Sequence, residues 1–176
     1  MKQLSKPISL VKSQSRNDCG PCSIASVLSF FTPDPMPLEA VSEKLRPWRI
    51  PLVGATLPWG IGRALRRLGM ETTGGFLGTL DDVKRNIDLD RPVVVLVRPT
   101  DLAHVPFYAL HYRVAIGYND RATPEDGELY FNCSAAPNSP SSLHPGNVAV
   151  DYKLFRRQWL TYCSINWYVA AYPGKG

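Results

Sequence analysis

Long apolar runs are missing from this chain, and their absence excludes a protein anchored by membrane-spanning helices. None of the apolar stretches in its 176 residues is long enough to cross a bilayer. The first eighteen residues, MKQLSKPISLVKSQSRND, are basic but lack the apolar stretch of a signal peptide. We therefore expect a protein that is made in the cytoplasm and stays there, or one that is secreted by a route without a cleaved signal peptide.

Cysteine and histidine are both scarce. Four cysteines are too few for a disulfide framework in a chain of this size. Cys19 and Cys22 form one CxxC pair, but no second pair follows to complete the four ligands of a structural zinc site. The three histidines are likewise isolated from other types of metal ligand. We therefore expect neither a metal nor another cofactor.

Charge of one sign is not concentrated anywhere. The net charge is +5, but the basic residues are scattered or paired, as in RALRR and LFRRQW. Aromatic residues do not alternate with these arginines as an RNA-stacking surface requires. We therefore expect a basic surface in contact with water and no nucleic-acid partner.

The order of the predicted elements indicates the fold class. Hydrophobic residues make up 44% of the chain, which suits one domain spanning residues 1–176. Apolar residues first recur at helical spacing and later alternate as in strands. Predicted helices come first, over about 18–90, and predicted strands follow, over about 91–173. This layout is typical of an α+β domain with a mainly antiparallel sheet. Helices are predicted at 19–31, 37–45, 56–70, 79–87 and 153–160, and strands at 91–99, 111–119, 127–133, 148–152 and 165–172.

Three residues are predicted to begin helices. Asp18 precedes the first helix as a natural N-cap, and Thr79 does the same for the fourth. Pro58 suits the first turn of the third helix because its missing N–H group would have no partner there. These signals place Cys19 at the N-terminus of an apolar helix.

The sequence from Gln14 to Phe31, QSRNDCGPCSIASVLSFF, allows two functional interpretations. Cys-Gly-Pro-Cys is the active-site tetrapeptide of thioredoxins, which carry it after a βαβ unit. Here eighteen residues precede Cys19, and the negative charge of Asp18 would oppose a low thiol pKa. The alternative is a single nucleophile, Cys19, with Cys22 one turn deeper in the core.

The nucleophile interpretation uses more of the surrounding residues. A helix N-terminus favours the thiolate that attacks an amide. Gln14 is placed to supply a side-chain amide to the oxyanion, together with the backbone N–H of Cys19. Gly20 fits a close approach of substrate to the backbone.

A general base is required as well. His111 opens a predicted strand, from which its ring can project toward a neighbouring helix. His104 and His144 lie in loops beside prolines and lack such a rigid support. We therefore predict His111 as the base.

A third residue should orient the imidazole of His111. Asn132 ends the next predicted strand, and adjacent antiparallel strands can place its side chain beside His111. Asp120, in the turn after the His111 strand, and Asp151, farther along, are alternative orienting residues.

Taken in order, these segments resemble the papain-like cysteine peptidases, in particular the bacterial double-glycine leader peptidases that process bacteriocins. The resemblance rests on QSRNDCGPCSIASVLSFF, on HYRVAIGYND, and on YKLFRRQWL followed by INWYVAAY. It implies a papain-like fold with helices packed on the sheet, Cys19 as nucleophile, His111 as base and Gln14 as oxyanion donor. The leader peptidases usually carry Asp-Pro at the third position. This chain has FNCSA there, in which Asn132 is the nearest match.

The leading functional hypothesis is a thiol hydrolase that cleaves a peptide or protein substrate through a thioester on Cys19. Cleavage after small residues such as Gly-Gly is implied by the resemblance alone. An alternative is a secreted toxin or effector that cleaves or deamidates a target-cell protein and has a cognate inhibitor or immunity protein. A non-catalytic leader-peptide-binding domain and a thiol–disulfide oxidoreductase are further alternatives.

Overall fold

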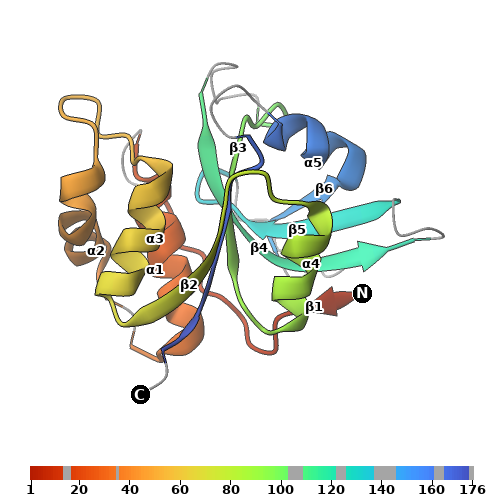
Figure 1. Ribbon diagram of the computed structural model, residues 1–176, viewed down its shortest axis with the longest axis horizontal. Helices are drawn as coiled ribbons and strands as arrows, with labels where there is room; N and C mark the ends of the chain where they lie inside the picture. The colour runs from red at the N-terminus through yellow and green to blue at the C-terminus, as the bar shows by residue number, and fades with distance from the viewer. Residues whose placement is uncertain are drawn as a thin grey trace.

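An antiparallel sheet separates two groups of helices (Figure 1). This computed structural model describes residues 1–13, 17–34, 36–102, 109–121, 126–136, 146–160 and 165–174. Within these residues seven strands form one sheet in the order β2-β7-β3-β4-β5-β6, and β1 pairs with β4. The predicted α+β class with a mainly antiparallel sheet is confirmed. The strands are β1 (Lys2–Gln3), β2 (Met70–Gly75), β3 (Val93–Val97), β4 (His111–Asp120), β5 (Gly127–Asn132), β6 (Val148–Asp151) and β7 (Tyr168–Pro173).

The helices lie on both faces of this sheet. One face carries α1 (Cys19–Phe31), α2 (Leu38–Leu45) and α3 (Pro58–Arg67), and the other carries α4 (Leu80–Asp88) and α5 (Tyr152–Trp159). None of the helices in the described ranges is long and apolar enough to cross a membrane.

Alternation along the strands produces a separate core on each face. Val94, Leu96, Tyr112 and Val114 pack with α1, α2 and α3. Their neighbours Val93, Val95, Val97 and Ala115 pack with α4 and α5. Because successive residues of a strand point to opposite faces, the run VVVLV is buried on both sides.

Strand β4 pairs with three other strands, β1, β3 and β5. Along one edge β3 pairs with its first half, from Val97↔His111 to Val93↔Ala115, and β1 pairs with its second half. Along the other edge β5 pairs with β4 and is interrupted by a bulge between Ala115 and Gly117. The first residue of β4 therefore lies at the edge of the sheet where β3 ends.

The sequence missed strand β2. We predicted a helix that continues to Met70, but α3 ends at Arg67, and Gly69 has a φ of +83°. A residue with this backbone conformation cannot continue a right-handed helix, and glycine adopts it at little cost. The following residues pair with β7, which lies between β2 and β3.

The three predicted helix starts are confirmed, although one of them lacks its capping hydrogen bond. Thr79 and Asp82 form a reciprocal capping box at α4, and Pro58 is in the first turn of α3. Asp18 occupies the N-cap position of α1 but makes no capping hydrogen bond.

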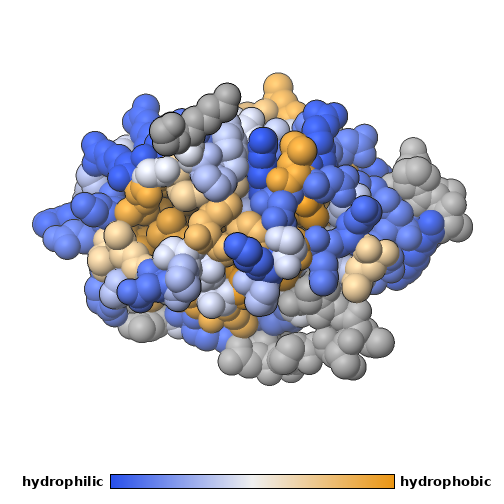
Figure 2. Space-filling model, turned by 90° about the horizontal axis from the view of Figure 1, so that it is seen from below, coloured by the Kyte–Doolittle hydropathy of each residue, from blue (hydrophilic) through white to orange (hydrophobic). Residues whose placement is uncertain are grey.

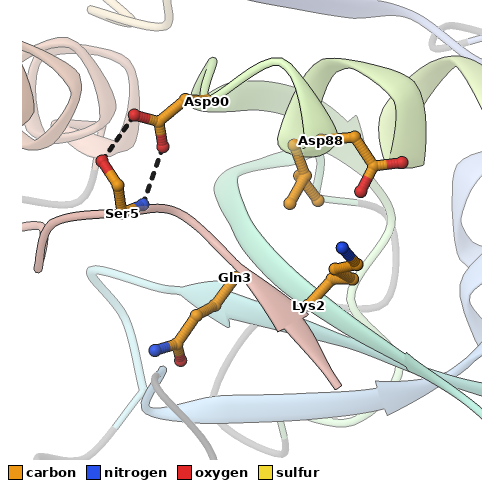
Figure 3. Close-up of a pocket in the computed structure, with 6 residues that line it drawn as sticks. Lys2, Gln3, Ser5, Asp88 and Asp90 are labelled. Atoms are coloured by element: carbon orange, nitrogen blue, oxygen red, sulfur yellow. Dashed lines mark hydrogen bonds between the residues drawn. The ribbon is translucent and has the colours of Figure 1, made fainter.

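The N-terminal segment is fixed to both halves of the molecule. Ser5 donates from its backbone N–H and its hydroxyl to the carboxylate of Asp90, at 2.7 and 2.5 Å (Figure 3). The pocket at this junction is lined by residues from β1 to Ser5 and from the end of α4 and the turn after it (Figure 3). Farther along, the N–H groups of Ser9 and Val11 donate to the hydroxyls of Ser29 and Ser26 in α1.

A second hollow lies at the C-terminal end of α1. In the view from below, apolar residues gather on the half of the surface formed by the first three helices (Figure 2). This groove is remote from Cys19, which begins the same helix. Its lining residues are Leu28, Thr32, Asp34, Met36, Pro37 and Leu68.

A buried ion pair links β4 to α5. The guanidinium of Arg113, which is fully buried, donates to both carboxylate oxygens of Asp101 at 2.8 and 3.0 Å. Gln158 of α5 donates to the same carboxylate at 2.7 Å. Although burial opposes it, the hydrogen bonds from Arg113 lower the pKa of Asp101 below its ordinary value.

We expect Arg113→Met to lower the free energy of unfolding by about 3–5 kcal/mol, because it leaves a partly buried carboxylate without its cation. Arg121→Met is the matched control. Arg121 is exposed and lies 3.7 Å from Glu128, so its loss should cost less than about 1 kcal/mol. Urea unfolding of both variants measures the difference, and equal costs would contradict the role of the buried pair.

The same pair predicts a pH dependence. Because the folded-state pKa of Asp101 lies below its unfolded value, its stabilisation is present above about pH 4 and is lost as the pH falls further. The difference between wild type and Arg113→Met should therefore shrink in acid.

Candidate active site

Cys19 is the first residue of α1 and lies against the start of β4. The backbone N–H groups of Tyr112 and Gly20 reach its sulfur. Tyr112 directly follows His111, so the structure brings the predicted nucleophile and the predicted base to the same edge of the sheet. The helix start and the strand start thus converge, as the sequence predicted.

Burial determines the protonation state of the Cys19 thiol. It raises the pKa of Cys19 above its ordinary value, although the N–H groups of Tyr112 and Gly20 act in the opposite direction. We expected the helix N-terminus to favour the thiolate, but this effect does not outweigh the loss of solvation. A raised thiol pKa makes the thiolate harder to form, so that a nearby base would assist nucleophilic attack.

Gly20 is closely packed against Thr56. A Cβ atom on Gly20 would lie 2.5 Å from the hydroxyl oxygen of Thr56. The segment that leads into α3 therefore passes directly over the start of α1. Its main chain is tied to the sheet because the Tyr112 hydroxyl donates to the Thr56 carbonyl at 2.8 Å.

His111 is buried at the beginning of β4, with 6% of its surface exposed. Its Nε2 atom lies 3.2 Å from the sulfur of Cys133. Cys133 is also close enough to Cys19 for a negative charge on it to raise the pKa of the Cys19 thiol further. Cys133 therefore lies beside the His111 ring and near Cys19, at the edge of the sheet.

Asn132 is directed elsewhere, contrary to our prediction that it contacts the His111 ring. It pairs with Val114, which faces α1, whereas His111 belongs to the alternate set of β4 residues. Its amide nitrogen donates to the carbonyl oxygen of Ile8 at 3.1 Å. Asn132 therefore holds the N-terminal segment, and the next residue, Cys133, contacts the imidazole instead.

The two aspartates considered as alternative orienting residues also have other partners. Asp120 ends β4, at the opposite end from His111, where it binds Lys84 at 2.5 Å and accepts a hydrogen bond from Tyr152. Asp151 caps α5 by accepting from the N–H groups of Lys153 and Leu154. Neither position is near the start of β4.

An apolar loop lies beside the helix start. Arg49 forms an ion pair with Asp18 at 3.4 Å and donates to the carbonyl of Gly54 at 2.7 Å. The side-chain amide of Asn17 donates to the carbonyl of Val53. These contacts fix the loop next to Cys19 while its large side chains stay exposed to solvent. The exposed apolar residues of this loop and the start of α3 are Ile50, Leu52, Val53 and Trp59.

Cys22 is not arranged as a redox partner. It is buried, and burial together with the charge of Asp18 raises its pKa to about 12. No disulfide joins Cys19, Cys22 and Cys133. A thiol with this pKa is a poor resolving group, because exchange requires a thiolate.

Some predicted residues lie outside the described part of the chain. These are the predicted oxyanion donor, two of the histidines and one cysteine: Gln14, His104, His144 and Cys163. Among the described residues, no three His, Cys, Asp or Glu side chains converge as metal ligands would.

The comparison with protein families identifies the class of protein. Residues 1–162 match the model of the Peptidase_C39 like family. The chain therefore belongs to this family, and the resemblance to double-glycine peptidases noted in the sequence is confirmed. No match was found among curated proteins.

Solved structures show the same fold. The peptidase domain of Streptococcus ComA, a bifunctional ABC transporter involved in quorum sensing, is 18% identical, with a TM-score of 0.63 over 95% of this chain and 99% of that one. A double-glycine motif protease from an AMS/PCAT transporter, solved with its leader peptide, is 16% identical, with a TM-score of 0.59 over 99% of each chain. A protein described as a C39-like peptidase from Bacillus anthracis is 12% identical, with a TM-score of 0.68 over the whole of both chains.

The environments of the thiols predict different rates of alkylation. Cys19 is partly exposed, whereas Cys22 and Cys133 are 1% and 0% exposed. Iodoacetamide should therefore modify Cys19 well before these two. Peptide mapping by mass spectrometry at successive times measures the order, and protein unfolded in urea is the control in which the thiols lose their differences. Equal labelling of the three in folded protein would contradict the site.

Proposed function

We propose that this protein is a cysteine peptidase that cleaves a peptide bond of a peptide or protein substrate through a thioester on Cys19. The observation that carries the proposal is the position of Cys19, a partly exposed thiol at a helix N-terminus beside the strand that begins with His111. Membership of a peptidase family supports it independently.

The first chemical step uses a base because the raised pKa of the Cys19 thiol makes its thiolate harder to form. His111 takes the proton from sulfur, and the sulfur attacks the carbonyl carbon of the substrate. The imidazolium then gives the proton to the leaving amine as the C–N bond breaks. A water molecule, deprotonated by His111, hydrolyses the thioester and releases the acid.

The negative oxygen of each tetrahedral intermediate requires hydrogen-bond donors. The backbone N–H of Cys19 is at the free N-terminal end of α1, where N–H groups have no partner within the helix. We assign the second donor to the side-chain amide of Gln14, as the family resemblance implies.

The surroundings of Cys19 favour an extended peptide as substrate. The apolar loop fixed by Arg49 presents Leu52, Val53 and Trp59 beside the helix start, where apolar substrate side chains can be buried. A peptidase similar in fold has been solved with a leader peptide bound. We therefore propose a leader-type peptide, cleaved after small residues such as Gly-Gly.

Substitution of the two thiols of the CxxC pair separates a peptidase from an oxidoreductase. With a double-glycine leader peptide as probe, Cys19→Ser should abolish cleavage, because a hydroxyl is far less acidic than a thiol and is a weaker nucleophile. Cys22→Ser should cleave at nearly the wild-type rate. Mass spectrometry of the products measures both. An insulin-reduction activity that depends equally on both cysteines would instead support a redox function.

Gln14 provides a test of the oxyanion step. Gln14→Ala should lower kcat about a hundredfold, on the order of 3 kcal/mol, because one of two donors is lost. Gln14→Glu should be at least as damaging, since it places a carboxylate where negative charge develops. Cys19 alkylation and the unfolding midpoint serve as controls and should change little. Full activity of Gln14→Ala would remove this residue from the mechanism.

A further inference from the structure

We infer that the buried thiol of Cys133 is the group that positions His111, in the place where related peptidases use a carboxylate or an amide. The inference rests on the proposed function, because it concerns the base of that reaction. Cys133 lies directly after β5, and its sulfur is 3.2 Å from Nε2 of His111. A side chain in this position acts on catalysis through the imidazole and does not touch the substrate.

The contact selects one tautomer of the ring. A neutral histidine carries its proton on one nitrogen, and the other nitrogen is a proton acceptor. A hydrogen bond from the Nε2–H group to the sulfur of Cys133 keeps the ring proton on Nε2, and the proposed transfer from Cys19 then goes to Nδ1. The opposite tautomer would place a hydrogen on Nδ1 and block this transfer. Cys133 can therefore determine whether His111 serves as a base.

Exposure distinguishes the roles of the two thiols near His111. Cys133 is 0% exposed, so a substrate cannot reach its sulfur, whereas Cys19 is partly exposed. Cys133 contacts the imidazole, whereas Cys19 is the thiol that solvent and substrate can reach. Cys133 is left with an orienting function.

The structure holds Cys133 rigidly. The side chain of Asn147 accepts from the Cys133 N–H at 2.9 Å and donates to the Cys133 carbonyl at 3.0 Å. These two hydrogen bonds resemble those between paired strands, but the partner of the Cys133 main chain is the side-chain amide of Asn147. Leu102 and Ala136 pack in the same small buried cluster. A positioning residue needs such support, because a loosely held group cannot orient its partner.

A thiol differs from a carboxylate in the field that it creates at the imidazole. Among the described residues, the charged and titratable groups near the contact include Arg113 on the same face of β4, Asp101 paired with it, Cys19 on α1, and Lys12, which donates to the carbonyl of Ala136. A thiol orients its partner by hydrogen bonding, whereas an ionised carboxylate also stabilises the cationic form of an imidazole.

The test measures the rate of Cys19 alkylation by iodoacetamide against pH, in the full chain, and so needs no substrate. Cys133→Ala should slow alkylation near neutral pH on the order of tenfold, because part of the general-base effect of His111 is lost. Cys133→Ser, which keeps a hydrogen-bonding group, should restore most of the rate. Cys133→Asp should extend fast alkylation to lower pH, because a carboxylate raises the pKa of the imidazole and stabilises the thiolate–imidazolium pair.

Nitrogen-15 NMR of the His111 ring measures its tautomer, which would not depend on Cys133 if the role of that residue were purely structural. Wild type should show the Nε2–H tautomer, and Cys133→Ala should show a mixture. Cys22→Ala, which removes the other buried thiol, is the matched control and should alter neither the tautomer nor the alkylation of Cys19. Unfolding midpoints identify any variant whose fold is impaired. If Cys133→Ala is impaired, the His111 tautomer in Cys133→Ser, measured by NMR, decides whether the hydrogen-bonding group at position 133 orients the ring.

Two outcomes separate the inference from the proposed function. If His111→Ala leaves the alkylation profile of Cys19 unchanged, the proposed Cys19–His111 pair is wrong. If His111→Ala slows alkylation but a folded Cys133→Ala keeps the wild-type rate, pH profile and tautomer, the pair stands and the role of Cys133 is overturned.

Discussion

The register between β4 and β5 determines which side chains can reach His111. At the hairpin end Asp120 pairs with Gly127, and after the bulge Val114 pairs with Asn132. Without the bulge the same ladder would place Asn132 opposite Ala115, on the face that His111 shares. The extra residue in β4 moves Asn132 to the other face and brings Cys133 to the imidazole. One inserted residue thus changes which side chain contacts the His111 ring.

The surroundings of His111 are consistent with this arrangement. On one face, Asn132 binds the N-terminal segment, which packs along the middle of α1. On the other face, to which His111 belongs, Arg113 forms its ion pair with Asp101. Opposite charges are thus paired on the side of the sheet that His111 shares.

Much of the fold could be predicted because its signals are local. The helical stripe after Cys19, the valine run of β3 and the cap at Thr79 depend on neighbouring residues, and each was found where the sequence placed it. Strand β2 was missed because a chain reversal at Gly69 interrupts a pattern that otherwise reads as helix. The convergence of Cys19 and His111 followed from the order of the elements.

The predictions about the site that were wrong concern features that depend on contacts between segments distant in the sequence. The face occupied by Asn132 is set by a bulge in β4, and its one local sign, Gly117 within the strand, does not show which side chains the bulge moves. The raised pKa of Cys19 reflects burial by segments distant along the chain, which a helix N-terminus alone does not reveal. The contact of Gly20 with Thr56 is equally non-local.

The docking of the N-terminal segment has a consequence for the order of assembly during synthesis. Lys2 pairs with Tyr118, Leu4 donates to the carbonyl of Ile116, and Asn132 binds the carbonyl of Ile8. These residues leave the ribosome long before the strands that receive them, so they must wait without partners while most of the chain is made. Contacts between such distant residues slow folding and leave an early segment open to chaperones or to mispairing. The surroundings of Cys19 are thus completed late, after β5 has emerged.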